Sequence, residues 1–246
     1  MLGVERLDGI MEMLKDGQAV SIHTMSKTLF ISESTLRRDL AALQKEGLIR
    51  RIRGGAILAA NNRYLPHLIR ENEVPDIKET IGAQAAALVK PSDVILMDPS
   101  TSVSYMVPYL PQRSDLMVIT TGLKTALALS ERHIRTMVTG GSVIDNGYSL
   151  VGSYTEPMLG DIMADTFFFS CRGVGADGRI CGTCMEEIQV RRMMARHARR
   201  VVFLMPSHKI GREYYYTYGS LADVDQVISD VPLPAEWQEM VGKNRK

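Results

Sequence analysis

The feature that most constrains how this chain folds is the spacing of the leucines in residues 32–56. Leu36, Leu40 and Leu43 recur at helical spacing, Ser32 precedes them as an N-cap candidate, and Gly47 follows them as a stop. The pattern predicts an amphipathic helix whose leucines pack inward.

Two further patterns place this helix in a known motif. Helical spacing of apolar residues predicts two earlier helices. The first ends before Gly17 and buries Leu7, Ile10, Met11 and Leu14. The second begins after Ser21 and buries Ile22, Met25 and Leu29. A turn at residues 30–32 then joins two short helices into a helix-turn-helix. After it, "LIRRIRGGAIL" alternates apolar and basic residues around Gly54 and Gly55, which predicts the hairpin of a winged helix.

The inward leucines decide which side chains face outward. The outer face of the first turns then carries Ser34, Thr35, Arg37 and Arg38. The N-terminal end of a recognition helix reaches base edges in the major groove, where arginine binds guanine with two hydrogen bonds. The wing would neutralise phosphates with Arg50, Arg51 and Arg53.

The charge of the chain is basic only locally. The formal net charge is +1, with +2 in residues 1–57 and −1 in residues 58–246, and residues 47–57 contain three arginines and no acid. A solvated helix face, with Glu33 and Asp39 paired to Arg37 and Arg38, would explain the arginine pair alone. It does not explain the helix, the glycine hairpin and the acid-free wing together, so we expect binding to double-stranded DNA.

The chain divides into two domains with a linker between them. Residues 58–77 are polar, and Pro66 and Pro75 break any long helix there. We therefore expect a DNA-binding domain over residues 1–57, a linker over 58–77 and a second domain over 78–246.

The second domain alternates apolar strands with helices. The expected helices cover 78–89 and 122–130, with a helix-like segment over 103–110, and the expected strands cover 93–98, 116–121, 135–141 and 200–205. Such alternation predicts a parallel α/β sheet covered on both faces, with ligands beyond the carboxyl ends of the strands.

Polar residues follow several of these strands. The candidate effector site consists of Asp98, Ser100, Thr101 and Ser102 after one strand, Thr120 and Thr121 after the next, Gly140 and Gly141 after a third, and Lys209 after a late strand. Hydroxyls and backbone N–H groups at a helix start suit a phosphate. The plainer alternative is that the serines and threonines are N-caps and that Lys209 is solvated.

Residues 34–56, "STLRRDLAALQKEGLIRRIRGGA", resemble the N-terminal signature of the DeoR/GlpR family of bacterial transcriptional regulators, and the similarity runs through most of the chain. The resemblance implies a winged helix-turn-helix followed by an α/β sensor domain related to ribose-phosphate isomerase, sugar-phosphate deaminases and CoA transferases. It implies a repressor that forms a homodimer or homotetramer and is released by a phosphorylated sugar or related metabolite.

The family's ligand loops fall on residues 98–102, 120–121, 140–141 and 206–209. This chain departs from the family's pattern at four positions, three of them in these loops. Ser100 replaces a glycine, Thr121 replaces an asparagine, Ser170 stands where glycine is usual, and Pro206 replaces an aspartate. A serine narrows the approach to a phosphate, and the lost aspartate removes an acceptor for a sugar hydroxyl. The fold is expected to be retained, and whether ligand binding is lost or redirected stays open.

Two other functions compete with the sensor. One is a sugar-phosphate isomerase or deaminase with an appended domain. Such an enzyme needs a general base, for which Asp98 at a strand end and Asp177 are the candidates. Neither has a partner histidine or a second carboxylate that the sequence places beside it. The other is a DNA-binding protein whose C-terminal domain serves only oligomerisation. We expect no catalysis, because the winged helix has no role in an enzyme.

The remaining signals are weak. "GVGADG" at 173–178 matches a dinucleotide fingerprint but lacks a helix opening at its third glycine, and Cys181 and Cys184 have metal spacing without a second pair, so no cofactor and no metal are expected. No apolar run approaches the roughly 18 residues of a membrane span, the N-terminus has no secretory segment, and three cysteines make no disulfide framework. We expect a cytoplasmic protein that does not bind membranes.

Overall fold

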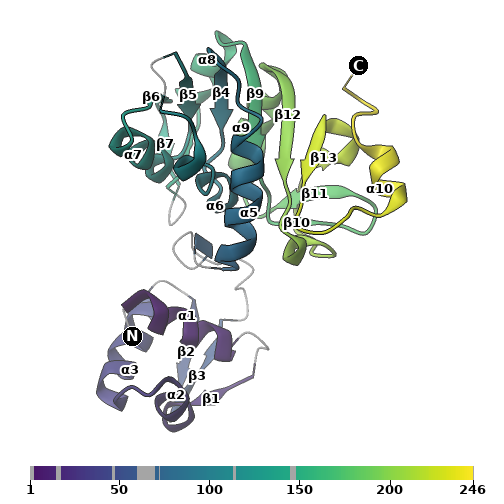
Figure 1. Ribbon diagram of the computed structural model, residues 1–246. Coiled ribbons are helices and arrows are strands. Elements are labelled where there is room, and N and C mark those ends of the chain that lie inside the picture. The colour runs from purple at the N-terminus through teal and green to yellow at the C-terminus, as the bar shows by residue number, and fades with distance from the viewer. Residues whose placement is uncertain are drawn as a thin grey trace. The chain divides into compact units, whose positions relative to one another are not determined.

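The computed structural model describes residues 3–14, 18–45, 48–59, 70–71, 73–112, 115–144 and 148–245. The chain forms two compact units, Met1–Glu73 and Val74–Lys246 (Figure 1). The division between them falls inside the segment 58–77 that the sequence marks as a linker. The predicted stops at Gly17 and Gly47 and the linker proline Pro66 lie outside the described residues.

The N-terminal unit contains a helix-turn-helix. Its elements are α1 (Gly3–Leu14), β1 (Val20–Ser21), α2 (Ile22–Leu29), α3 (Glu33–Lys45), β2 (Ile49–Ile52) and β3 (Gly55–Leu58). Ser21 caps α2 by accepting a hydrogen bond from the backbone N–H of Thr24 at 3.0 Å. The apolar stripes of the three helices meet in one core, where Ile10, Leu14, Met25, Leu36 and Leu40 are fully buried. The predicted helices and their inward faces are confirmed.

The wing is a three-stranded sheet in the order β1-β3-β2, rather than a hairpin alone. The backbone geometry explains why both hairpin positions are glycine. Gly54 has φ of +80°, which closes the turn, and a Cβ on Gly55 would overlap the carbonyl oxygen of Val20 in β1. The hairpin was predicted, whereas β1 was not.

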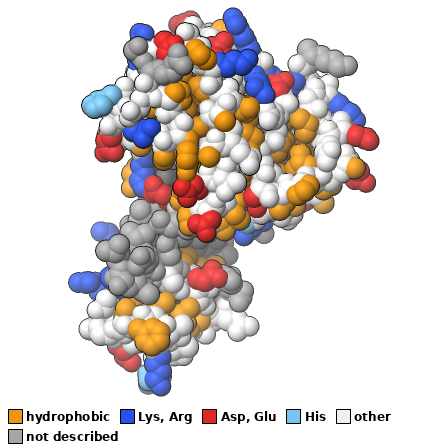
Figure 2. Space-filling model, in the orientation of Figure 1, with side chains coloured by type: hydrophobic (Ala, Val, Ile, Leu, Met, Phe, Trp, Pro, Cys, Tyr) orange, Lys and Arg blue, Asp and Glu red, His pale blue; other side chains and the backbone are white. Residues whose placement is uncertain are grey.

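The C-terminal unit is built on a six-stranded parallel sheet in the order β14-β12-β9-β4-β5-β6. In chain order its strands are β4 (Val94–Met97), β5 (Met117–Thr120), β6 (Arg135–Val138), β9 (Ala164–Phe169), β12 (Ala198–Leu204) and β14 (Gln226–Ile228). The predicted parallel α/β architecture is confirmed. Figure 2 shows acidic and basic side chains mixed over the visible face of this unit.

The phenylalanines of β9 show that both faces of the sheet are covered. Phe167 and Phe169 lie in one hydrophobic core and Phe168 lies in the other. Successive side chains of a strand point to opposite faces, so an unbroken apolar strand requires cover on both. The first core includes Ile188 of helix α9 (Met185–Arg196), and the second includes Ile81 of helix α5 (Pro75–Ala86).

Two predicted helices differ in extent. Helix α5 starts at Pro75, three residues earlier than expected, because proline is well suited to the first helical position. The segment 103–110 is not one helix: α6 (Thr101–Ser104) ends after four residues and a 3₁₀ turn, η1 (Val107–Tyr109), follows with Pro108 near its start.

The other described elements surround this sheet. They are α7 (Leu123–Glu131), β7 (Ser142–Val143), β8 (Leu150–Val151), α8 (Thr155–Gly160), β10 (Gly173–Val174), β11 (Arg179–Gly182), η2 (Ser207–Lys209), β13 (Tyr216–Ser220), η3 (Leu221–Asp223) and α10 (Ala235–Met240). A second sheet has the order β10-β11-β13, and β7 pairs with β8. "GVGADG" comprises β10 and the turn that leads into the antiparallel strand β11, which is not the strand-to-helix turn of a dinucleotide site.

Candidate DNA-binding face and effector site

The predicted recognition residues lie at the start of α3. Ser34, Arg37 and Arg38 are exposed and Thr35 is half-buried, while Leu36 between them is fully buried. Ser32 caps the helix, since its Oγ accepts a hydrogen bond from the backbone N–H of Thr35 at 3.3 Å. The helix therefore presents hydroxyl and guanidinium groups at its N-terminal end.

The acids next to these arginines have different roles. Glu33 pairs with Arg37 across one turn at 3.3 Å, and both side chains are about half exposed. Asp39 does not pair with the arginine pair: it is buried and accepts two hydrogen bonds from Arg6 of α1, at 2.9 and 3.3 Å. Asp39 thus ties α1 to α3, and an exposed pair such as Arg37–Glu33 holds its arginine only weakly.

The wing arginines Arg50, Arg51 and Arg53 are all exposed. Arg50 lies opposite Ile57 in the β2–β3 register and Arg51 lies opposite the buried Ala56. Because neighbouring residues of a strand point to opposite faces, these two side chains leave the wing on different sides.

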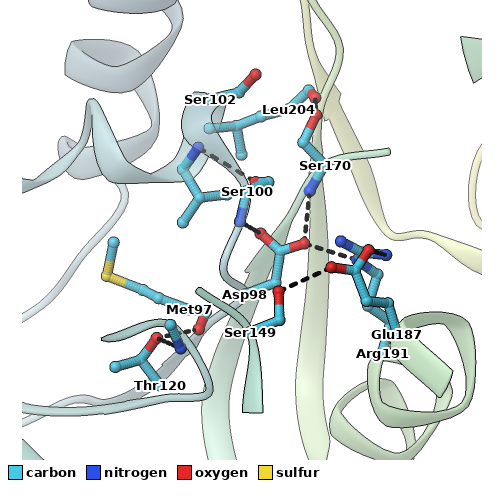
Figure 3. Close-up of polar contacts among 12 residues, drawn as sticks. Met97, Asp98, Ser100, Ser102, Thr120, Ser149, Ser170, Glu187, Arg191 and Leu204 are labelled. Atoms are coloured by element: carbon cyan, nitrogen blue, oxygen red, sulfur yellow. Dashed lines mark hydrogen bonds and ion pairs between the residues drawn. The ribbon is translucent and has the colours of Figure 1, made fainter. Parts of the chain in front are cut away.

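The carboxyl edge of the parallel sheet holds a buried ionic network (Figure 3). Asp98, directly after β4, is fully buried; its carboxylate accepts hydrogen bonds from the backbone N–H of Ser100 at 3.0 Å and from Nε of Arg191 at 2.7 Å. Arg191 also pairs with Glu187 at 3.3 Å, and Glu187 accepts a hydrogen bond from the hydroxyl of Ser149 at 2.7 Å. The network joins residues from β4, α9 and the β7–β8 region.

Arg191 is the charge centre of this network. Burial opposes its positive charge, but Glu187 and Asp98 outweigh that cost, so its pKa is raised above the ordinary arginine value. Sequence reasoning missed Arg191, Glu187 and Ser149 as site residues, and it left Asp98 without a second carboxylate, which Glu187 supplies. The sequence feature that could have identified two of them is the spacing of Glu187 and Arg191, because an acid and a base four residues apart on one helix can form an ion pair.

Lys209 forms a second polar cluster at the same edge. Its ammonium group donates hydrogen bonds to Ser170 Oγ at 2.7 Å and to Ser102 Oγ at 3.1 Å, and Lys209 is buried rather than solvated. The structure therefore brings together the ends of β4, β9 and β12 around this cation. Ser170, one of the four departures, is itself a ligand of Lys209.

Other predicted site residues have local structural roles. Ser100 caps α6 by accepting from the backbone N–H of Val103 at 3.4 Å. The Thr120 hydroxyl donates to the carbonyl oxygen of Met97 at 2.8 Å. A Cβ on Gly141 would overlap Thr155, so this glycine permits a close backbone approach. Thr101 and Thr121 are buried. Since α6 has only four residues, its dipole at Thr101 is weaker than a longer helix would provide.

The predicted residues also span a wide edge. Four strand-to-strand steps separate β6, which precedes Gly140, from β12, which precedes Lys209, or about 19 Å at the usual spacing. A small metabolite cannot touch both ends unless the loops fold inward. Thr139, between β6 and Gly140, is buried, and its hydroxyl has no hydrogen-bond partner within the described structure. Sequence reasoning missed this residue too.

The cysteines have no arrangement typical of a metal centre. Burial raises the pKa of Cys171 to about 12, and burial likewise raises that of Cys184 to about 11. Cys184 donates a hydrogen bond to Glu186 at 3.1 Å. In the described parts of the chain, no three His, Cys, Asp or Glu side chains are grouped as metal ligands, and no helix is long and apolar enough to cross a bilayer.

A helix-turn-helix with an outward basic face, followed by an α/β domain with polar strand ends, is the architecture of a transcriptional regulator with a sensor domain. Family models agree: the DeoR-like helix-turn-helix domain matches residues 6–62, and the DeoR C terminal sensor domain matches residues 73–231. The chain belongs to the DeoR family of DNA-binding transcriptional regulators, as the resemblance predicted.

Two relatives support this assignment, and one solved structure shares the fold. The HTH-type transcriptional regulator GolR of Listeria innocua serovar 6a is 30% identical over 94% of this chain and 91% of its own length. The glycerol-3-phosphate regulon repressor of Escherichia coli K12 is 25% identical over 98% of this chain and 96% of its own. Among solved structures, eIF2B delta of Chaetomium thermophilum resembles the fold with a TM-score of 0.50 and 13% identity over 66% of this chain and 58% of that chain.

Proposed function

We propose that this regulator is a cytoplasmic repressor that binds operator DNA through α3 and the wing and is released by a small phosphorylated metabolite at the carboxyl edge of the parallel sheet. The active form is a homo-oligomer that presents two winged helices to repeated half-sites. The Escherichia coli relative is a repressor of the glycerol-3-phosphate regulon, which supports both a repressor and a small phosphorylated metabolite as effector.

The DNA-binding proposal is supported most directly by the exposed N-terminal end of α3. Arg37 and Arg38 stand on its outer face, and Arg37 forms a weak surface pair with Glu33. Guanidinium groups in this position suit guanine edges. Arg37→Ala and Arg38→Ala should each weaken binding to the preferred operator by about 1–3 kcal/mol if the residue contacts guanine.

The measurement is a binding titration on a duplex selected from a random library with the full-length protein. Arg192→Ala, an exposed arginine of α9 in the other unit, is the control and should bind as wild type does. Wild-type affinity in both helix variants would show that the recognition face lies elsewhere.

The effector proposal is carried by Thr139. A buried hydroxyl without a partner is costly, and a ligand at this edge would satisfy it. Lys209, which donates to the Ser102 and Ser170 hydroxyls at the β12 end of the edge, supplies a cation that a phosphate requires. One small ligand can engage both Thr139 and Lys209 only where the loops between them fold inward. Inorganic phosphate and sugar phosphates should raise the melting temperature of the protein, and the matching unphosphorylated sugars should do so less.

The same ligands separate the rival functions. Conversion of a sugar phosphate would favour an enzyme, in which the Asp98–Arg191–Glu187 network would have to hold the general base. Binding without conversion favours the sensor. The absence of any stabilising ligand would favour a domain used only for oligomerisation.

A further inference from the structure

Phe30 is the most exposed of the large hydrophobic side chains in the described residues. It lies between α2 and α3 with 93% of its surface accessible to solvent. Its backbone is left-handed, with φ of 53° and ψ of 40°, and its N–H closes α2 by donating to the carbonyl oxygen of Lys27 at 3.4 Å.

This conformation is unfavourable for phenylalanine. A left-handed helix-closing position is the usual place for glycine, because a Cβ there crowds the following carbonyl oxygen. Exposure of the ring gives no packing energy within the chain in return. The residue is therefore costly for the fold in both respects, which points to a role outside the fold.

The position of Phe30 shows where that role lies. Only two residues separate it from Glu33, where α3 begins, and the turn is fixed on both sides. Ile31 donates its N–H to the carbonyl oxygen of Ser26 at 3.1 Å, and Ser26 returns a hydrogen bond from its hydroxyl to the carbonyl oxygen of Ile31. The backbone that carries the ring is thus fixed next to the start of α3, the helix end that carries Ser34 and Arg37.

We propose that Phe30 reads sequence by packing its ring on the C5-methyl group of a thymine in the operator. This inference rests on the proposed recognition face. The N-terminal end of a recognition helix enters the major groove, and the thymine methyl is the apolar group displayed there. A phenyl ring has no charge or hydrogen-bond donor for phosphates, so its contribution is specificity rather than salt-dependent affinity.

The test is a double-mutant cycle in which the protein and the DNA are changed separately and together, and operator affinity is measured for each combination. Phe30→Gly and Phe30→Asn remove the ring with residues that accept a left-handed backbone, and deoxyuridine replaces each operator thymine in turn to remove one methyl group. At one thymine, deoxyuridine should weaken wild-type binding about 3- to 10-fold and leave the binding of Phe30→Gly unchanged. The salt dependence of binding should be the same in both proteins.

The controls separate this contact from the fold and from the recognition face. Phe30→Gly should melt at the wild-type temperature or above it, because glycine relieves the backbone cost. Wild-type operator affinity in both Phe30 variants, or equal losses with deoxyuridine in wild type and variant, would overturn the proposal. If Arg37→Ala still loses affinity in that case, the recognition face stands without Phe30; if Arg37→Ala and Arg38→Ala also bind as wild type, the face itself is wrong.

Discussion

At the scale of single residues, Arg191 joins the two buried carboxylates of the sensor domain's ionic network. It is buried between Asp98 at 2.7 Å and Glu187 at 3.3 Å, so one cation compensates two carboxylates. Breaking a buried pair costs more than the pair contributes, because the remaining charges stay in a medium of low polarity.

Arg191→Met should therefore lower the free energy of unfolding by about 3–5 kcal/mol, as seen in urea titrations of the full-length protein. Arg192→Met is the matched control on the same helix. Arg192 is exposed and donates to the carbonyl oxygens of Tyr218 and Thr217, so its loss should cost about 1 kcal/mol. Adding Asp98→Asn and Glu187→Gln to Arg191→Met should restore part of the lost stability; equal losses in the two single variants would contradict this account.

Cys171 gives the protein a defined response to alkali. Burial raises its pKa from 9.0 to about 12, so the thiol ionises more easily in the unfolded chain than in the folded one. Its stabilising contribution is complete below pH 9 and is lost as the pH rises towards 12, at about 1.4 kcal/mol per pH unit. Urea titrations between pH 8 and 11 should show a flatter decline of stability for Cys171→Ala than for wild type. Parallel declines would mean that the folded thiol ionises normally.

At the scale of elements, the wing depends on one close approach of two strands. A Cβ at Gly55 would overlap the carbonyl oxygen of Val20; the oxygen belongs to the backbone and the Cβ is fixed directly to it, so neither atom can rotate away. Gly55→Ala should separate β1 from β3, cost about 1–3 kcal/mol of stability and weaken DNA binding with it. Gly160→Ala, where nothing lies within 4 Å of the added atom, is the control in circular-dichroism melting and operator binding. A Gly55→Ala variant as stable as this control would show that the strands adjust.

Elements could be predicted where the information is local. The spacing of apolar residues and the caps define α2 and α3, and continuous apolar runs define β4, β5 and β12. The strand β1 could not be predicted, because two residues become a strand only by pairing with β3. Similarly, the spacing of Glu187 and Arg191 indicates an ion pair along one helix, but only the tertiary structure shows that Arg191 also meets Asp98 while Arg192 donates to the backbone of β13. The strand ends were predictable, but the partners that reach them from other elements were not.

At the scale of the whole molecule, a ligand in the sensor domain can release DNA only if it binds the DNA-free conformation more tightly. The residues proposed for the ligand and for the DNA belong to different units, at Lys209 and Arg37 for example. Variants of the sensor edge should therefore change the response to effector without changing the affinity for operator.

Lys209→Met and Thr101→Val test this separation. The first removes the cation and keeps an unbranched side chain; the second removes a hydroxyl and keeps the shape. Both should bind operator with wild-type affinity and need at least about tenfold more effector for release, since one lost charged hydrogen bond is worth roughly 1.5–3 kcal/mol. The measurement is operator binding across a titration with the sugar phosphate that most stabilises the wild-type protein. Arg37→Ala should show the opposite behaviour, with weaker operator binding and unchanged effector affinity in the absence of DNA. Superimposable release curves for wild type and both sensor variants would place the effector away from Lys209 and Thr101.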